Sequence, residues 1–458
     1  MHDWTEATES LSAAVLEYAE GRIHLNPVPL DGPRPLDELV ADVGQTITPH
    51  GIGGHEALRL FAEVLAPACI SVDHPRYFSF IPCAPTPAST LFDLVVSASS
   101  LYGGSWLEGA GAVYAENQAL RWLADLAGFP AGAGGVFVQG GTLGNVSALI
   151  AARHWARAQL EAAGSPMPSR WAVAASAEAH SSIASAAAAM DVDLLAVEPD
   201  GLGRLTAPAL ERALAAERDS GAGRRPFAVV ATSGTTNLGI IDDLAGVGAV
   251  ARREGLWMHV DGAYGGAAMA APSVRPLFAG IEEADSFVVD PHKWLFAPFD
   301  CAALVYREPE KARAAHLQHA GYLEPLRTGA EWSPSDYALH LTRRARGLPF
   351  WFSLATYGTL AYSEAIERTL DVARHAEASV TSRPELELIA ERQLSVVAFR
   401  RVGWSEEQYY SWSRRLLREG TAFVVPTTHR GEIALRLAIV NPRSTEADVD
   451  LVLDSLRD

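Results

Sequence analysis

The hydrophobic pattern changes its period along the chain, and the first part is helical. Residues 8–23 and 55–68 carry apolar side chains at helical spacing, with a proline-rich connector at 25–39 between them. These segments predict helices with too little apolar surface to form a core of their own. We therefore expect residues 1–85 to form a helical arm that packs on the rest of the chain or on another subunit.

From about residue 134, short β-rich runs alternate with helical stretches such as 145–163 and 207–219. The runs that predict strands are 135–139, 171–176, 192–198, 227–233 and 256–262. This alternation predicts a mostly parallel sheet covered by helices on both faces. In such sheets ligands bind beyond the carboxyl ends of the strands. We expect this large α/β domain to span residues 86–365.

The last part of the chain has a third pattern. A long helix is expected from about residue 366, followed by strands at 394–402 and 433–441 and a final helix at 445–456. Residues 366–458 are therefore expected to form a small α+β domain.

Composition and charge narrow the class of protein. The 458 residues are 48% hydrophobic and 20% charged, as in ordinary globular enzymes. The net charge of −18, without a basic block, argues against nucleic acid or an anionic membrane as partner. Cys69, Cys83 and Cys301 lack metal-ligand spacing, so we expect reduced thiols and no metal site. Neither a signal-peptide pattern nor an apolar run near the roughly 20 residues of a membrane span occurs, which favours a cytoplasmic protein.

Four polar groups follow predicted strands. The glycine turn at 139–145 leads into a helix, whose amides and Thr142 hydroxyl could hold a phosphate, although a tight turn without ligand explains it equally well. His180 opens a helix, where it could also be a cap or a surface residue. Asp261 either caps a turn or meets a buried cation. Lys293 stands in an apolar run, where an unpaired ammonium is costly unless it reaches the surface.

The order and spacing of these groups resemble one family. The chain resembles the group II pyridoxal-phosphate-dependent amino-acid decarboxylases, which include the aromatic-L-amino-acid, glutamate and histidine decarboxylases. The matching stretches are HPRYFSF, GVFVQGGTLGNVSAL, AHSSI, VATSGTTNLGIIDDL, WMHVDGAYGG, DSFVVDPHKW, FDCAALVYR and TRRARGLPFW. They run in family order over nearly the whole chain, and HVDGAYGG followed by DPHKW is the most specific.

The resemblance implies a fold, a cofactor and an assembly. The fold is the PLP-dependent transferase fold type I, with a mostly parallel sheet of the seven-stranded type, flanking helices, an N-terminal arm and a small C-terminal domain. The cofactor is pyridoxal 5′-phosphate (PLP), and the protein is expected to be a homodimeric carboxy-lyase that acts on an amino acid.

The resemblance also assigns roles to residues. Lys293 matches the lysine that forms the Schiff base with the cofactor, Asp261 the partner of the pyridinium nitrogen, and His180 the imidazole stacked on the ring. The remaining cofactor contacts implied by the family are Gly141, Thr142 and His292 at the phosphate, and Thr232. Where the family often has Ser or Glu after the phosphate turn, this chain has Leu143 and Gly144. Any contact of Leu143 or Gly144 with the cofactor would therefore come from their backbone amides.

The substrate pocket is less well defined by sequence. Ser79 and Phe80 replace the amide pair with which glutamate-type members bind a distal carboxylate, so glutamate is not expected. Phe80, Ile81 and Pro82 suggest an apolar or aromatic side-chain pocket. Arg76 and Arg436 are possible carboxylate partners, or form surface salt bridges.

A second substrate segment resembles one that the family lends from the neighbouring subunit. Tyr102 and Gly104 lie in this segment, LYGGSW. Gly104 stands where aromatic-amino-acid decarboxylases tend to have phenylalanine, which leaves room for a larger ring.

One departure from the family concerns the product. The family tyrosine that protonates the substrate's Cα falls at Pro334, so Tyr337 is the expected substitute and Tyr322 an alternative. The function implied is α-decarboxylation of an aromatic or bulky apolar L-amino acid to the amine and carbon dioxide. Members without the tyrosine can instead use oxygen and give an aldehyde. A non-catalytic protein of this fold is a third possibility.

Overall fold

A seven-stranded sheet forms the centre of the molecule. The computed structural model describes residues 2–327 and 331–457. The strands, in the spatial order β1-β7-β6-β5-β4-β2-β3, are β1 (Gly134–Val138), β2 (Arg170–Ser176), β3 (Asp193–Val197), β4 (Arg224–Thr232), β5 (Trp257–Asp261), β6 (Ser286–Val289) and β7 (Ala302–Tyr306). Strand β7 runs antiparallel to both of its neighbours, and the other pairs are parallel. The predicted mostly parallel α/β sheet is confirmed.

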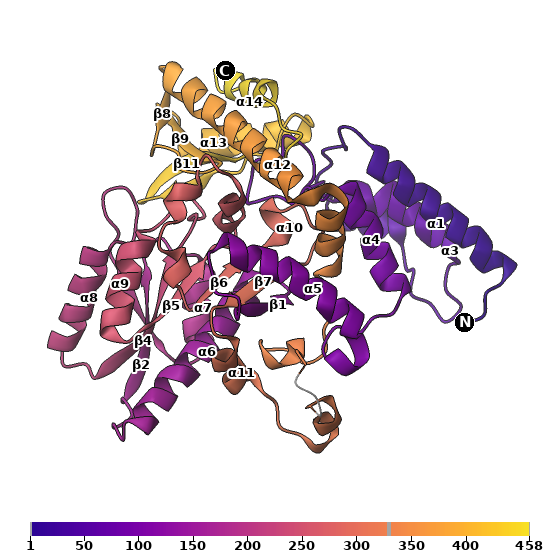
Figure 1. Cartoon of the computed structure of the whole chain (residues 1–458). Helices are drawn as coiled ribbons and strands as arrows, with labels where there is room; N and C mark the ends of the chain where they lie inside the picture. The colour runs from indigo at the N-terminus through magenta and orange to yellow at the C-terminus, as the bar shows by residue number, and fades with distance from the viewer. Residues whose placement is uncertain (1, 328–330, 458) are drawn as a thin grey trace.

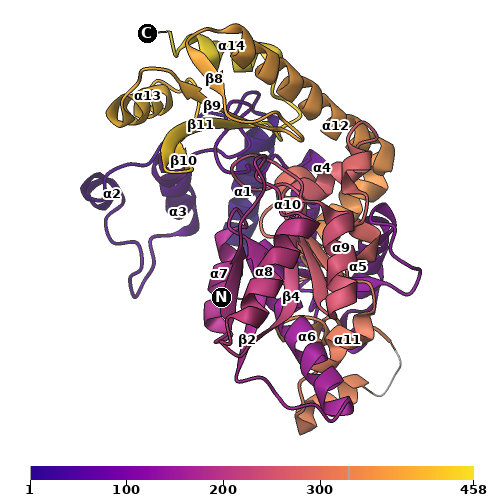
Figure 2. The ribbon, with the colours of Figure 1, turned by 90° about the vertical axis from the view of Figure 1, so that its left-hand side faces the viewer.

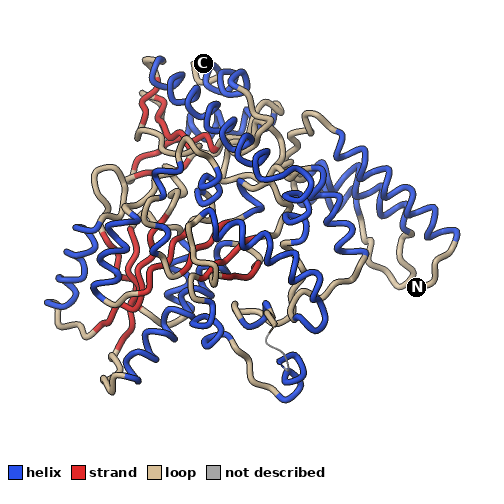
Figure 3. Tube along the Cα trace, viewed as in Figure 1, coloured by secondary structure: helices blue, strands red, loops and turns tan. Residues whose placement is uncertain are grey.

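Helices cover both faces of this sheet, which explains why its strands are almost continuously apolar. Figure 3 shows the red strands enclosed by blue helices. One face packs on α6 (Gly141–Ala162), α7 (Ser181–Ala189) and α11 (Pro309–His316). The other packs on α5 (Trp106–Leu126), α8 (Ala207–Asp219) and α9 (Leu244–Glu254). In β1 the side chains alternate accordingly, Val136 and Val138 facing the first group and Phe137 the second.

A small antiparallel sheet forms the C-terminal part, above the large sheet in Figure 1. Its strands are β8 (Leu386–Leu388), β9 (Val396–Arg401), β10 (Thr427–His429) and β11 (Glu432–Ala438), and its helices are α13 (Glu406–Arg418) and α14 (Glu446–Asp454). The expected long helix is α12 (Leu348–Ser382), which starts well before residue 366. It therefore crosses the predicted boundary between the two domains as it leads from one sheet to the other.

The N-terminal helices lie at one side of the molecule, away from the large sheet (Figures 1 and 2). They are α1 (Glu6–His24), α2 (Leu36–Val43) and α3 (Gly54–Leu60), continued by a wider turn at Phe61–Leu65, and α4 (Pro87–Ala98) follows. Neither α1 nor α2 contains a buried residue. Within the described ranges, no helix combines the length and the apolar character needed to cross a bilayer.

Candidate active site

A cavity of about 340 Å³ lies at the carboxyl ends of the parallel strands. Thr232 ends β4 and pairs in register with Asp261, which ends β5. Lys293 lies in the short helix α10 (Pro291–Trp294) that follows β6, and α6 and α7 begin beside it after β1 and β2. The sequence-predicted residues that line this cavity are Lys293, His180, Asp261, Gly141, Thr142, Thr232, His292, Phe80, Ile81 and Arg436. Parallel topology thus brings together groups as far apart in the sequence as Gly141 and Lys293, a separation of 152 residues.

Lys293 places its amine on a buried acid. Its Nζ lies 2.9 Å from Oδ2 of Asp290, which is almost wholly inaccessible to solvent. The same oxygen accepts a hydrogen bond from the backbone N–H of Gly141 at 3.2 Å. The second oxygen of Asp290, Oδ1, has no partner in the described part of the chain. Lys293 is therefore paired at the cavity wall rather than extended to the surface, and Asp290 is a site residue that the sequence analysis did not name.

His292 lies near the same carboxylate oxygen of Asp290. Its Nε2 is 3.6 Å from Asp290 Oδ2, and its Nδ1 accepts a hydrogen bond from the Cys301 backbone N–H at 3.0 Å. Burial lowers the pKa of His292. A neutral ring that accepts at Nδ1 carries its proton on Nε2, so His292 offers a donor at the wall of the cavity.

Asp261 is held by two donors. Its Oδ1 accepts from the Ala263 backbone N–H at 3.1 Å, and its Oδ2 from the side-chain amide of Asn145 at 2.9 Å. Asn145 comes from the first turns of α6 and is itself buried. The sequence analysis did not name it, although an amide side chain on the apolar face of a helix was a visible signal. The carboxyl group is buried and lines the cavity, in addition to accepting a hydrogen bond within the turn.

His180 both caps α7 and lines the cavity. Its Nδ1 accepts from the backbone N–H of Ser182 at 3.2 Å and lies 2.9 Å from the Ser182 hydroxyl. The predicted cap is therefore confirmed, and the same histidine lies at the wall of the cavity, where its expected role toward a cofactor stays a prediction.

The first turn of α6 has the geometry of an anion site. The helix is 22 residues long, and its N-cap, Gly140, provides no side chain to bond the first amides. A Cβ on Gly141 would stand 2.9 Å from the Ala263 Cβ, so only glycine lets the chain pass here. The Thr232 hydroxyl is buried and has no partner among the described residues. An anion-binding turn, an unpaired hydroxyl, a carboxylate and an amine around one cavity fit a phosphorylated pyridine aldehyde such as PLP.

Arg436 supplies a buried cation to the same cavity. Its guanidinium donates to the Thr236 carbonyl, and no acidic side chain pairs with it in the part of the chain that the structure describes. Desolvation lowers its pKa. The expectation of a surface salt bridge is therefore wrong for Arg436. It holds for Arg76, which pairs with Asp448 at 3.1 Å.

Two residues predicted to contact a ligand are not among those that line the cavity, Leu143 having been expected to do so only through its backbone amide. Leu143 does not line it, and its side chain packs against the core beneath α6. Pro82 likewise lies outside the lining, one residue beyond Ile81.

The structure does not bring Tyr337 to the cavity. Its ring stacks on Trp332 with centroids 3.7 Å apart, and only 3% of the residue is exposed. Burial raises the pKa of its hydroxyl. This corrects the expectation that Tyr337 faces the reacting atoms, because its side chain belongs to the core between α11 and β1.

Tyr102 and Gly104 also lie outside the cavity of their own chain. The Tyr102 hydroxyl donates to the Leu341 carbonyl at 3.0 Å. Its ring lies over Gly104, where an added Cβ would be 2.3 Å from the Tyr102 oxygen. Neither residue is among those that line the cavity beside Lys293 of the same chain.

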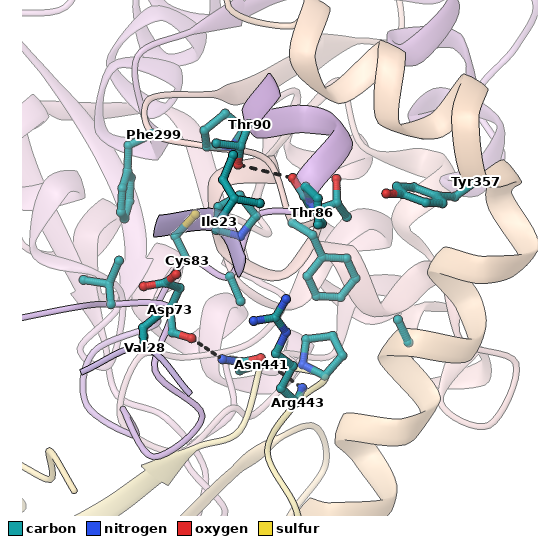
Figure 4. Close-up of a pocket in the computed structure, with 18 of the residues that line it drawn as sticks. Ile23, Val28, Asp73, Cys83, Thr86, Thr90, Phe299, Tyr357, Asn441 and Arg443 are labelled. Atoms are coloured by element: carbon teal, nitrogen blue, oxygen red, sulfur yellow. Dashed lines mark hydrogen bonds between the residues drawn. The ribbon is translucent and has the colours of Figure 1, made fainter. Parts of the chain in front are cut away.

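A second, more apolar cavity of about 560 Å³ is shown in Figure 4. Ile23 and Val28 of the arm, Cys83 and Phe299 line it together with Tyr357 of α12. At its lower edge in the figure, the Asn441 amide donates to the Asp73 carbonyl at 2.9 Å. The arm, the large sheet domain and the C-terminal domain therefore meet around this cavity.

Comparison with known proteins agrees with this chemistry. Residues 56–402 match the family described as the pyridoxal-dependent decarboxylase conserved domain. The aromatic-L-amino-acid decarboxylase of Sus scrofa is 33% identical over 86% of this chain and 84% of its own length.

Solved structures show the same fold. The structure of Oryza sativa TDC with PLP and tryptamine superposes with a TM-score of 0.91 at 25% identity, over 100% of this chain and 99% of that one. The 4-hydroxyphenylacetaldehyde synthase of Rhodiola rosea gives 0.88 at 24% identity over 100% and 99%, a likeness of fold alone. Together with the cavity, these matches show that the chain belongs to the pyridoxal-dependent decarboxylases, the PLP-dependent carbon–carbon lyases that act on amino acids.

Proposed function

We propose that this protein decarboxylates an aromatic or bulky apolar L-amino acid at Cα, giving the amine and carbon dioxide. The observation that carries the proposal is the convergence of Lys293, Asp261 and His180 on one cavity at the carboxyl edge of the sheet. A non-catalytic protein of this fold has no need to keep an amine, a buried carboxylate and an imidazole in this arrangement.

Each site residue has a task in this reaction. PLP, when bound, supplies the electron sink for breaking the bond between Cα and the carboxylate. Lys293 is the amine that holds the cofactor aldehyde, and Asp261 holds a proton at the ring nitrogen. The amides of the α6 turn, Thr142 and His292 bind the phosphate, and His180 packs on the ring face.

The walls of the cavity favour an apolar side chain. Phe80 and Ile81 line it. Positions 79 and 80 hold Ser and Phe instead of two amide side chains that could bind a distal carboxylate. An unpaired distal carboxylate against these side chains would be strongly disfavoured. Arg436 is the cation suited to the substrate's own carboxylate, because its charge is buried without an acidic partner among the described residues. The name of the Sus scrofa relative supports an aromatic substrate.

Formation of an aldehyde with oxygen is the second candidate. It is favoured by one observation, the placement of Tyr337 in a buried stack instead of at the cavity. The amine remains the proposed product because the relatives with the greater sequence identity are named as decarboxylases.

A substrate panel tests both. The purified protein with PLP is given tryptophan, tyrosine, phenylalanine and glutamate, and carbon dioxide, hydrogen peroxide and the organic product are measured. We expect the aromatic amino acids to give amine and carbon dioxide without peroxide. Preference for glutamate would overturn the substrate, and stoichiometric oxygen consumption would overturn the product.

The protein is proposed to act as a cytoplasmic homodimer with composite sites. Apolar side chains are exposed on the arm and on α4 and α12, among them Leu36 (76%), Leu91 (55%) and Leu360 (70%). Such surface is typical of an interface. Tyr102 and Gly104 face no ligand of their own chain, so they serve the cavity of a second copy.

A further inference from the structure

A continuous series of hydrogen bonds runs behind the cavity, from β5 and β6 through α6 to the start of α7. Its members, called here the histidine relay, are Trp257, Ser286, His259, Asn145, Ser182 and His180. All except His180 are buried, and His259 is wholly inaccessible. Buried polar groups of this kind must each find a partner, so the pattern of donors and acceptors can be worked out.

The direction of the relay is set at Asn145. A carboxylate only accepts, so the end of the amide that lies 2.9 Å from Asp261 Oδ2 is the nitrogen. The second hydrogen of that nitrogen goes to the Ser182 hydroxyl oxygen at 3.0 Å. The amide oxygen then faces His259 Nε2 at 2.9 Å, which must carry a proton.

The position of the His259 proton also fixes the direction of the hydrogen bond to Ser286 of β6. Burial lowers its pKa to about 4, so the ring is neutral and carries one proton, on Nε2. Its Nδ1 therefore accepts from the Ser286 hydroxyl at 2.8 Å. The Ser286 oxygen accepts in turn from the Trp257 indole N–H, a group that can only donate, at 2.9 Å. All the hydrogens on this side have one possible position.

The other branch ends at the cavity. Because the Ser182 oxygen accepts from Asn145, its own hydrogen is available to His180 Nδ1 at 2.9 Å. The Ser182 backbone N–H also points to Nδ1, at 3.2 Å. A nitrogen that receives two donors carries no proton. The proton of His180 is thus on Nε2, which has no partner among the described residues.

We propose that Asn145 and His259 are positioning residues that fix His180 in its Nε2–H form and aim the Asp261 carboxylate through one shared amide. The ring that faces the cofactor then always presents a donor, and the two groups that act on the cofactor keep a fixed relative orientation. The roles of His180 and Asp261 toward the cofactor rest on the proposed function, whereas the tautomer of His180 does not.

The test compares two substitutions of His259. In His259→Gln the amide can still donate to Asn145 and accept from Ser286, so the relay keeps its direction. In His259→Leu the Asn145 oxygen loses its donor, and the amide is released. The readout is the ¹⁵N spectrum of histidine-labelled protein, with and without PLP, in which the His180 signal is assigned by its loss in His180→Gln.

We expect wild type and His259→Gln to show His180 protonated at Nε2 alone, and His259→Leu to show a mixture of tautomers. Turnover should fall at least about tenfold in His259→Leu and be largely restored in His259→Gln. His316→Leu is the matched control, because His316 is a buried histidine that bonds the Ser147 carbonyl at 3.0 Å outside the relay. It should lower the melting temperature and leave the His180 signal unchanged.

Two results would overturn the proposal: His180 protonated at Nδ1 in wild type, or an unchanged His180 signal in His259→Leu. If His259→Leu does not fold, Asn145→Ala replaces it, because it removes the donor to the Ser182 oxygen, and an unchanged His180 signal in that variant would likewise overturn the proposal. If His180 is protonated at Nε2 as proposed but the protein forms no amine, only the proposed function is contradicted. Failure of the positioning proposal and failure of the proposed function can therefore be told apart.

Discussion

Lys293 is one of only two lysines in the chain, and the other, Lys311, pairs with Glu308 on α11. This makes its assignment easy to test. Borohydride treatment of the protein with PLP should label Lys293 alone, because its amine lines the cavity beside Asp290. Peptide mapping reads the label, and Lys311 is the internal control. A label on Lys311, or one that survives in Lys293→Ala, would show that the amine has another role.

Asp261 can be changed with almost no change of shape. Asp261→Asn should retain PLP and lose about 100-fold or more in kcat, since a neutral amide no longer holds the ring nitrogen protonated. Absorbance of the bound cofactor and steady-state rates measure the two effects. Near-native turnover in this variant would reduce Asp261 to a turn residue that bonds Ala263.

Arg436 differs from most arginines of the chain in being buried without an acid beside it among the described residues. Arg436→Gln should raise KM for the amino acid by about 10- to 100-fold, the range expected for lost hydrogen bonds to a charged group. Arg76→Gln is the matched control, because that arginine pairs with Asp448 outside the cavity. An equal rise of KM in both variants would mean that Arg436 does not bind the substrate.

At the scale of elements, the segment around Pro334–Asp336 decides whether Tyr337 acts on the substrate. Because Tyr337 is stacked on Trp332, we expect Tyr337→Phe to leave the ratio of amine to aldehyde unchanged. Tyr322→Phe, on an exposed turn, is made in parallel. Product analysis with peroxide detection is the measurement. Less amine and more peroxide in Tyr337→Phe would show that this tyrosine leaves the stack during turnover. Tyr337 would then be the proton donor that the sequence predicts.

The elements themselves could be predicted where burial on both sides makes a strand a continuous apolar run. The runs at 135–139 and 256–262, for example, are β1 and β5. Strand β7 was missed although Ala302–Tyr306 is also a fully buried apolar run, and its antiparallel direction could not be predicted because these residues do not show which strands they pair with. The stacking of Tyr337 was hidden for the same reason: a count of positions places a residue along the chain and does not show which side chains it meets.

The site residues that lie in recognisable sequence motifs could be predicted. Lys293, Asp261 and His180 each follow a strand in a recognisable stretch, and the structure brings them to one cavity. Asp290 and Asn145 were not named, because their importance lies in contacts across the fold. A single atom of Asp290 contacts both Lys293 and Gly141, which lie 152 residues apart in the sequence.

At the scale of the whole molecule, the proposed dimer can be tested by mixing. Subunits with Lys293→Ala and subunits with Tyr102→Ala should each be inactive. After mixed refolding they should recover about a quarter of wild-type activity, because about half of the dimers are mixed and each of these holds one complete site. The control mixes Lys293→Ala subunits with subunits that carry both Lys293→Ala and Tyr102→Ala. This mixture should recover no activity. A fully active monomer in sedimentation would contradict the composite site.

The lack of buried residues in α1 and α2 has a consequence for how the enzyme is made. The sheet domain has its own core and can fold as soon as one chain is synthesised. The apolar side chains of α1 and α2 become buried only when a second chain arrives, so the last step of maturation is bimolecular in the proposed dimer. At low expression, the amount of working enzyme would therefore rise with roughly the square of the number of chains, and a cell that doubles its messenger would gain more than twice the activity.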